Sequence, residues 1–184
     1  IAARLSERGI HMLDAPVSGG AQGAIDATLA IMAGGHAAVL ERVRPLLDCL
    51  GQRIVHIGPN GAGQVAKACN QMIMVAAIEA AAEAMRLAAG AGVDYAKVRQ
   101  ALAGGSAASR VLDVMGERMV RRDFAAGIEA RLHHKDFGLV LEAARKSGVP
   151  VPLTATVAQQ LNALMAQGWG RDDTASLLRV LELA

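Results

Sequence analysis

The sequence predicts a short α/β segment followed by an all-α segment, with one long helix joining the two. Three observations support this prediction. Short apolar runs that end in glycines alternate with a helical pattern as far as residue 58. Residues 65–91 form a long apolar stretch with sparse charges, and only helical patterns follow it. We therefore expect residues 1–58 to be the α/β part and residues 59–184 to be the all-α part.

Composition narrows the function classes before any motif is considered. Of 184 residues, 53% are apolar and 20% charged, which is enough apolar material to bury a core and argues against disorder. A net charge of +2 and an aromatic content of 2% leave little for binding nucleic acid, so we expect no such partner. The most apolar stretch, Met72–Gly92, is interrupted by Glu79, Glu83 and Arg86, so no membrane span is expected.

The cysteines and the first residues indicate the setting of the chain. Cys49 and Cys69 are far apart and form no CxxC motif, which disfavours a disulfide scaffold or a zinc ribbon and predicts a reducing, cytoplasmic location. No signal peptide is apparent in IAARLSERGI. That opening is typical of the end of a helix that enters a strand, so we expect a longer protein of which this is a piece.

The first part predicts strands and one helix, each bounded by glycines. Pro16 and the pair Gly19-Gly20 end the first run, and Gly51 follows the helical pattern. The predicted strands are Met12–Val17, Thr28–Met32 and Arg53–Ile57, and the predicted helix is His36–Leu50.

The second part predicts helices alone. The first, Val65–Ala91, is apolar on most of its surface, as is typical of a helix buried in a domain centre or a subunit interface. Pro150 and Pro152 separate two of the later helices, and Asp172 or Asp173 is a plausible N-cap for the last. The later helices are expected over Tyr95–Ala103, Ser109–Val120, Ala130–Ser147, Leu153–Gln167 and Asp172–Leu183.

A glycine-rich segment, GPNGAGQVAKACNQM (residues 58–72), opens the long helix. Gln64 and Val65 stand where a P-loop needs Lys and Ser/Thr, so a binding site for a nucleoside triphosphate is disfavoured. The glycines instead allow a sharp turn from a strand into a helix. Lys67 then lies near the positive end of that helix, where its pKa should fall toward the range of a general acid, with Asn70 on the same face. A solvated surface lysine is the alternative.

The motif DAPVSGG (residues 14–20) ends a strand in Ser18, Gly19 and Gly20. Consecutive backbone N–H groups at small residues can bind a carboxylate or phosphate, and the serine hydroxyl adds a donor. An ordinary turn is the alternative interpretation. GGSAAS (residues 104–109) is equally open between a substrate-facing loop and a simple connection between helices.

The motif HHKDF (residues 133–137) lies near the start of a helical pattern. Adjacent side chains on a helix point about 100° apart, so His133 and His134 cannot bind one ion from a regular helix. We therefore expect no metal site that uses them with Asp136. Lys135 is a candidate for reaching an anion, and an exposed ion pair with Asp136 is the alternative.

Together and in this order, DAPVSGG, G-x-G-x-x-x-K-x-x-N (Gly61 to Asn70) and K-D-F resemble the β-hydroxyacid dehydrogenase family over essentially the whole chain. The resemblance implies that residues 1–58 are the C-terminal part of a Rossmann-like NAD(P)-binding domain. It also implies that residues 59–184 are an all-α domain for substrate binding and oligomer formation. Phe137 stands where the family commonly has leucine, and the family's N-terminal G-x-G-x-x-G fingerprint is not in this sequence.

The resemblance also implies the roles of individual residues. Lys67 corresponds to the catalytic lysine, and Asn70 to the asparagine beside it that contacts substrate. Ser18, Gly19 and Gly20 correspond to the segment that holds the substrate carboxylate, and Lys135 to a lysine that contacts the cofactor, NAD or NADP.

The expected activity is an NAD(P)-dependent interconversion of a short β-hydroxy acid and its semialdehyde by a homo-oligomer, a dimer or tetramer. GGSAASRVLD resembles the tartronate semialdehyde (2-hydroxy-3-oxopropionate) reductase branch, and the 3-hydroxyisobutyrate dehydrogenase branch is the alternative. A hypothesis of another class is that this chain by itself is an inactive module for oligomer formation and substrate binding.

Overall fold

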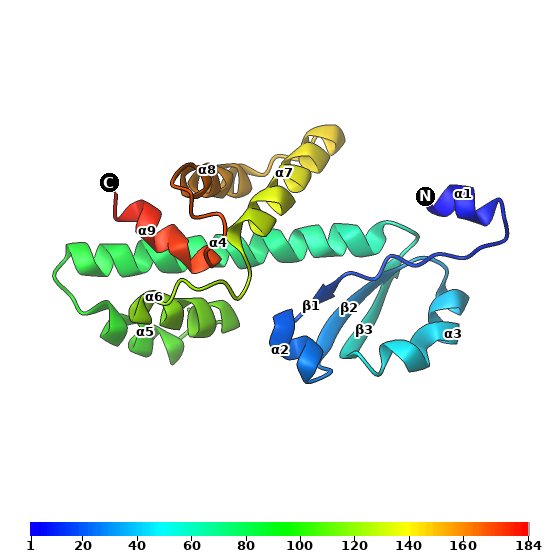
Figure 1. Ribbon diagram of the computed structural model, residues 1–184, viewed down its shortest axis with the longest axis horizontal. Helices are drawn as coiled ribbons and strands as arrows, with labels where there is room; N and C mark the ends of the chain where they lie inside the picture. Colours follow the sequence, from blue (N-terminus) through cyan, green and yellow to red (C-terminus); the bar gives the residue numbers. More distant parts are fainter. Residues whose placement is uncertain (184) are drawn as a thin grey trace. The chain divides into compact units, whose positions relative to one another are not determined.

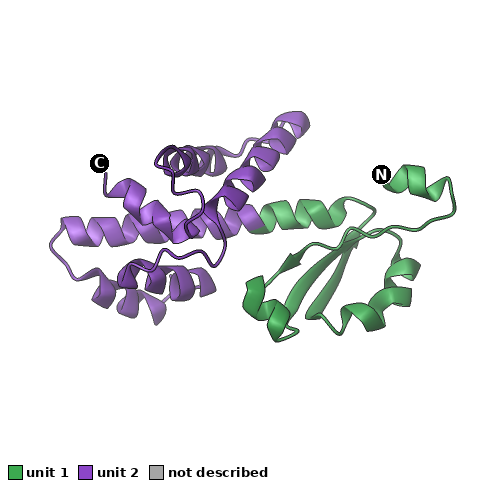
Figure 2. Cartoon of the chain, viewed as in Figure 1, with its two compact units in different colours: residues 1–70 green, residues 71–184 purple. Residues whose placement is uncertain are grey.

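A computed structural model of the chain describes residues 1–183. The chain divides into two compact units, residues 1–70 and 71–184 (Figure 2). The 29-residue helix α4 (Ala62–Gly90) begins in the first unit and ends in the second. The long helix expected over Val65–Ala91 is therefore confirmed. The boundary expected after residue 58 precedes this helix and stays a prediction.

The first unit is built on a three-stranded mixed sheet with the order β1-β2-β3 (Figure 1). β1 is antiparallel to β2, with Val17 opposite Ile31, and β2 is parallel to β3. The helix α3 makes the crossover between the two parallel strands and packs on β3, as parallel neighbours require. The elements are α1 (Ala2–Ser6), β1 (Val17–Ser18), α2 (Gly20–Ile25), β2 (Leu29–Gly34), α3 (Ala37–Leu47) and β3 (Gly51–Gly58).

The strand expected over Met12–Val17 is wrong in extent, because only Val17 and Ser18 form a strand. Upstream, Asp14 makes an isolated bridge with Gly34. Pro16 has no N–H to donate to a ladder, and only its carbonyl oxygen is used, accepting from Met32 N at 3.0 Å. The sheet therefore pairs continuously only after the proline.

The short helix α2 was not predicted, because its glycines lower helix propensity. Packing accounts for Gly23 and for Gly19, which precedes the helix, whereas Gly20 has open space around it. A Cβ on Gly19 would lie 3.0 Å from Leu29 Cδ2, and a Cβ on Gly23 would lie 3.2 Å from the same atom. Close approach to the side chain of Leu29 therefore selects small residues here.

Within the described residues of the second unit every regular element is helical, and an isolated bridge joins Glu129 and Asp173. The elements after α4 are α5 (Tyr95–Ala103), the π-helical turn η1 (Leu112–Gly116), α6 (Glu117–Arg121), α7 (Ala130–Ser147), α8 (Pro152–Ala166), the 3₁₀ turn η2 (Thr174–Ser176) and α9 (Leu177–Leu181). The helix expected over Ser109–Val120 is therefore observed as η1 followed by α6. The last predicted helix is observed as η2 followed by α9.

The second unit has a continuous apolar core. On α4 the buried side chains recur at helical spacing, at Val75, Ile78, Ala82 and Met85. They pack in one cluster with side chains of α7, α8 and α9, among them Phe137, Leu161, Leu164 and Leu177. Figure 1 shows these helices gathered around the second part of α4. Within residues 1–183, no helix combines the length and hydropathy that crossing a membrane requires.

Candidate active site

The glycine-rich segment before α4 binds an anion, but the anion is a side chain of the same chain. The carboxylate of Asp14 accepts hydrogen bonds from Gly61 N at 2.6 Å and from Gln64 N at 3.2 Å. These backbone N–H groups belong to the start of α4, where no intrahelical acceptor exists for them. The donors that a P-loop would offer to a phosphate are thus used by Asp14, in agreement with the sequence argument against a P-loop.

The Asp14 carboxyl group is buried. Burial raises its pKa, but the hydrogen bonds from the backbone of Gly61, Gln64 and nearby residues outweigh this effect and hold the pKa below its usual value of 3.8. Asp14 is therefore ionised at neutral pH, with its negative charge at the positive end of α4.

Lys67 lies in the second turn of α4 and is half-buried. Its Nζ atom donates a hydrogen bond to the carbonyl oxygen of Val17 in β1, at 2.8 Å. This contact directs the amine to the residue that immediately precedes Ser18. The alternative of a fully solvated surface lysine does not describe this side chain.

Ser18, Gly19 and Gly20 form the turn from β1 into α2. Ser18 is half-buried and lies opposite Ala30 in the sheet. Gly19 has φ = 142° and Gly20 has φ = 66°, which side chains with a Cβ rarely adopt. The turn is therefore sharp, exposed and without side chains at its two glycines, so another group can approach its backbone closely.

Asn70 follows Lys67 by three residues on α4 and is half-buried. Three-residue spacing puts both side chains on one face of the helix. Within the first unit, the structure thus places the amine of Lys67 beside Val17, next to Ser18, and the helical spacing puts Asn70 on the face of α4 that carries Lys67.

Lys135 belongs to the second unit, on α7. Its side chain is 63% exposed, and its Nζ lies 2.9 Å from Asp136 Oδ1. The other oxygen of that carboxylate accepts from Nε2 of the buried Gln71 at 2.7 Å. Asp136 thus connects Lys135 to α4, which a plain exposed ion pair would not do.

The two histidines beside Lys135 have different partners. Nδ1 of the buried His133 lies 2.6 Å from Thr174 Oγ1, whereas His134 Nε2 lies 2.8 Å from Asn162 Oδ1. Within residues 1–183 no group of three or more histidine, cysteine or acidic side chains has an arrangement that could hold a metal ion.

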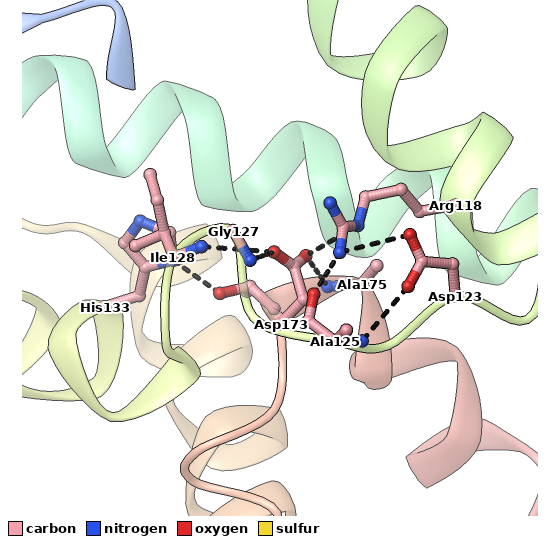
Figure 3. Close-up of polar contacts among 9 residues, drawn as sticks. Arg118, Asp123, Ala125, Gly127, Ile128, His133, Asp173 and Ala175 are labelled. Atoms are coloured by element: carbon pink, nitrogen blue, oxygen red, sulfur yellow. Dashed lines mark hydrogen bonds and ion pairs between the residues drawn. The ribbon is translucent and has the colours of Figure 1, made fainter. Parts of the chain in front are cut away.

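The start of α7 is fixed by Asp173, which is 1% exposed (Figure 3). Its Oδ2 accepts from Gly127 N at 3.0 Å and from Ile128 N at 3.3 Å, and its Oδ1 accepts from Ala175 N at 3.0 Å. Arg118 Nε lies 3.8 Å from Oδ1. The sequence indicates Asp173 only as an N-cap, which it is for η2. Its bonds to the loop before α7 have no local sequence signal.

A family model of the NAD-binding domain of NADP-dependent 3-hydroxyisobutyrate dehydrogenase matches residues 61–181. A second model, the NAD binding domain of 6-phosphogluconate dehydrogenase, matches residues 1–58. The chain belongs to the β-hydroxyacid dehydrogenase family. Its members are oxidoreductases, and the descriptions of both models imply NAD or NADP as the cofactor.

Curated relatives include several β-hydroxyacid dehydrogenases. The 2-hydroxy-3-oxopropionate reductase of Escherichia coli is 47% identical over 99% of this chain and 62% of its own length. The NAD-dependent L-serine dehydrogenase of Pseudomonas aeruginosa is 38% identical over 99% of this chain and 63% of its own length. This chain therefore spans about three-fifths of the length of these relatives.

Solved structures of the β-hydroxyacid dehydrogenase family have the same fold. The 3-hydroxyisobutyrate dehydrogenase of Salmonella typhimurium matches with a TM-score of 0.90 and 31% identity, over 97% of this chain and 63% of that one. The 3-hydroxyisobutyrate dehydrogenase of Mycobacterium tuberculosis, solved with L-serine, matches with a TM-score of 0.87 and 33% identity, over 97% of this chain and 64% of that one.

The described residues fit only part of a dinucleotide site. Within residues 1–183 no strand is followed by the G-x-G-x-x-G turn that binds a pyrophosphate. Lys135, an exposed primary amine on a helix held by Asp136 and Asp173, fits a contact with a polar or anionic group of the cofactor.

Proposed function

We propose that this chain forms the substrate-binding and catalytic part of an NAD(P)-dependent β-hydroxyacid dehydrogenase. In this proposal residues 1–58 are the end of a Rossmann-like domain, and residues 59–184 are an all-α domain that begins with α4. The observation that carries the proposal is the 2.8 Å hydrogen bond from Lys67 Nζ to Val17 O. It places an amine beside the turn that we assign to the substrate carboxylate.

Substrate binding begins at the turn after β1. The hydroxyl of Ser18 donates a hydrogen bond to the substrate carboxylate, and the backbone N–H groups of Gly19 and Gly20 approach the carboxylate without hindrance from side chains. A carboxylate held there directs the carbonyl group of a short semialdehyde toward Lys67. Positioning of this kind can lower the barrier by several kcal/mol.

Lys67 is the proposed general acid. When the carbonyl is reduced, the ammonium group stabilises the developing alkoxide and donates a proton to its oxygen, and in the oxidation direction the amine accepts that proton. Asn70 holds the same oxygen or the ammonium group from one helical turn away. A nicotinamide cofactor, when bound, supplies or accepts the hydride, and Lys135 contacts that cofactor.

The substrate that we propose is 2-hydroxy-3-oxopropionate. The 47% identity to the E. coli reductase supports this choice over the 36% identity to the mitochondrial 3-hydroxyisobutyrate dehydrogenase of Drosophila melanogaster, and GGSAASRVLD supports the same branch. 3-Hydroxyisobutyrate and L-serine are the alternatives that the names of other relatives suggest.

A homo-oligomer is part of the proposal. Large apolar side chains are exposed on three helices of the second unit, at Ile73 and Leu87 on α4, Leu139 on α7 and Leu153 on α8. Burial of these side chains against another subunit would remove apolar surface from water and so stabilise an oligomer.

The test is a comparison of substrates with the full-length protein, with NADH or NADPH for reduction and NAD⁺ or NADP⁺ for oxidation. In the oxidation direction we expect kcat/KM for glycerate, the reduction product of 2-hydroxy-3-oxopropionate, to exceed kcat/KM for 3-hydroxyisobutyrate or L-serine by at least about tenfold. The three acids differ only in the group on C2, and a mismatch of one group in a binding pocket costs about that much. The variant Ser18→Ala should raise KM for the acid by about 5- to 100-fold through one lost hydrogen bond. Ser147→Ala, on the exposed end of α7, is its control.

Absence of turnover with all three acids would reject the proposed activity. The remaining hypothesis, that this chain alone is an inactive module, is tested separately by assaying residues 1–184. Measurable turnover without a further segment would reject that hypothesis.

A further inference from the structure

Asp14 is tied to the sheet through its backbone and to α4 through its side chain. Its N–H donates to Gly34 O at 3.0 Å, and its carbonyl oxygen accepts from Gly34 N at 2.7 Å. Its carboxylate accepts from Gly61 N and Gln64 N. One residue therefore joins the end of β2 to the start of the helix that carries Lys67.

The space around this carboxylate is closely fitted. A Cβ on Gly34 would lie 2.6 Å from Asp14 Oδ2, and a Cβ on Gly63 would lie 2.8 Å from the same oxygen. Real Cβ contacts essentially never come this close, so both glycines are needed for the carboxylate to fit. In the glycine-rich segment it is therefore Gly63 that makes room for Asp14, and a Cβ at this position would also lie 2.3 Å from Met32 O.

A second tie joins the same two segments. Val17 follows Asp14 by three residues, and Lys67 follows Gln64 by three residues. The hydrogen bond from Gln64 N to Asp14 and the one from Lys67 Nζ to Val17 O are therefore equally spaced along both segments. Two hydrogen bonds at separate points restrict both translation and rotation of α4 relative to the segment that leads to Ser18. A single hydrogen bond would still allow rotation.

We propose that Asp14 is a positioning residue that sets the place of Lys67 relative to the Ser18–Gly20 turn. This inference rests on the proposed function, because Asp14 can have a positioning role in catalysis only if Lys67 acts on a substrate held by that turn. Asp14 holds the N-terminal turn of α4 through its carboxylate, and the position of that turn sets the position of Lys67 on the same helix. A displacement of about 1 Å at the reacting atoms can reduce a rate by about 100-fold.

The experiment compares Asp14→Asn and Asp14→Ala in the full-length enzyme. Asparagine keeps one acceptor oxygen for Gly61 N–H but turns its NH₂ group toward a second donor, and alanine keeps no acceptor. We expect kcat to fall by about 10- to 100-fold in the asparagine variant and further in the alanine variant. The Kd for NAD(P)H should stay within about twofold, because the dinucleotide does not depend on where Lys67 lies. Asp48→Asn, an exposed aspartate at the end of α3, is the matched control and should retain full kcat.

Several outcomes would overturn the inference. One is a folded Asp14→Asn enzyme with the kcat of the unchanged enzyme. Another is a loss of activity that is fully accounted for by a smaller folded fraction, measured by circular dichroism, so that kcat per folded molecule is unchanged. If Asp14→Asn does not fold, Asp14→Ser is measured instead, since a serine oxygen still accepts from an N–H group, and its kcat should also fall with Kd for NAD(P)H retained. Failure of both variants to fold would assign Asp14 to folding alone and reject the positioning role.

The proposed function fails through a different measurement. Near-normal turnover of a Lys67→Ala enzyme would reject the catalytic lysine whatever Asp14 does. Loss of turnover in Lys67→Ala together with full turnover in Asp14→Asn would reject only the positioning role.

Discussion

The Nζ atom of Lys67 on α4 lies 2.8 Å from the carbonyl oxygen of Val17 in β1. The two residues are 50 positions apart in the chain, and the contact places the amine next to the turn formed by Ser18, Gly19 and Gly20. Lysine side chains lose considerable rotamer freedom when they are held in one place. A lysine held by a backbone carbonyl beside a turn with two glycines is suited to act on a group bound at that turn.

Replacement of Lys67 by arginine separates charge from proton transfer. Arginine keeps a cation and a donor for Val17 O, but its pKa lies too high for it to give up a proton in the reaction. We expect kcat to fall by about 10² to 10⁴-fold, the usual contribution of a general acid. Steady-state kinetics of the full-length enzyme test this, with Lys97→Arg on the exposed face of α5 as the control. If the arginine enzyme kept most of its kcat, Lys67 would act through its charge alone.

Replacement of Lys135 by alanine should weaken cofactor binding. Loss of one charge-assisted hydrogen bond corresponds to about a tenfold increase in Kd for NAD(P)H. Stability should change little, since the side chain is 63% exposed and its ion pair with Asp136 is of the kind that contributes little. Quenching or enhancement of cofactor fluorescence on titration measures Kd. Lys146→Ala, near the other end of α7 and paired with Glu142, should leave Kd unchanged, and equal effects of the two variants would contradict the assignment of Lys135.

Replacement of Asp173 by alanine should destabilise the second unit. It removes the acceptor of three backbone N–H groups and one of the partners of Arg118 (Figure 3). Loss of one partner in a buried charged network costs about 3–5 kcal/mol in free energy of unfolding. Urea denaturation measures this quantity. Asp123→Ala removes another partner of Arg118 that is 49% exposed and should cost less than about 1 kcal/mol. Equal losses in the two variants would show that Asp173 has no special weight.

Glu79 makes the stability of the protein depend on pH. This side chain of α4 is 4% exposed, and neither of its carboxylate oxygens has a hydrogen-bond partner within residues 1–183. Burial, with a smaller contribution from the charge of Glu83, raises the pKa of Glu79 from 4.5 to about 7. The folded protein therefore binds this proton more tightly than the unfolded chain. The resulting stability is complete below about pH 4.5 and is lost as the pH rises through about 7.

The variant Glu79→Gln carries no charge at any pH. We expect it to match the unchanged protein near pH 4.5 and to exceed it above pH 7, by at most about 3 kcal/mol in free energy of unfolding. Urea denaturation at a series of pH values measures the difference. Glu83→Gln changes an exposed position one turn away. Because Glu83 contributes only a small part of the raised pKa of Glu79, this variant should lose only slightly less stability above pH 7 than the unchanged protein does. Parallel pH profiles for Glu79→Gln and the unchanged protein would contradict a raised pKa.

The sequence determined the elements whose ends are defined locally. The predictions of Tyr95–Ala103 and Ala130–Ser147 match α5 and α7 at both ends. Asp94 caps the first of these with its own side chain, and Gly148 ends the second in the left-handed conformation. The family could also be recognised from the sequence, because its motifs are short runs of residues that occur in a fixed order.

Tertiary structure alone decided the elements and contacts that depend on distant parts of the chain. The helix α2 forms in spite of its two glycines, and one of them, Gly23, lies close to the side chain of Leu29, a contact that no local pattern indicates. Asp14 meets the N–H of Gly61 across 47 positions, and Asp173 meets that of Gly127 across 46. The partner of a buried carboxylate is set by which backbone donors the fold leaves without an acceptor. Composition and periodicity do not indicate which backbone donors these will be. The spacing of Lys67 and Asn70 on one helix, in contrast, follows directly from the sequence.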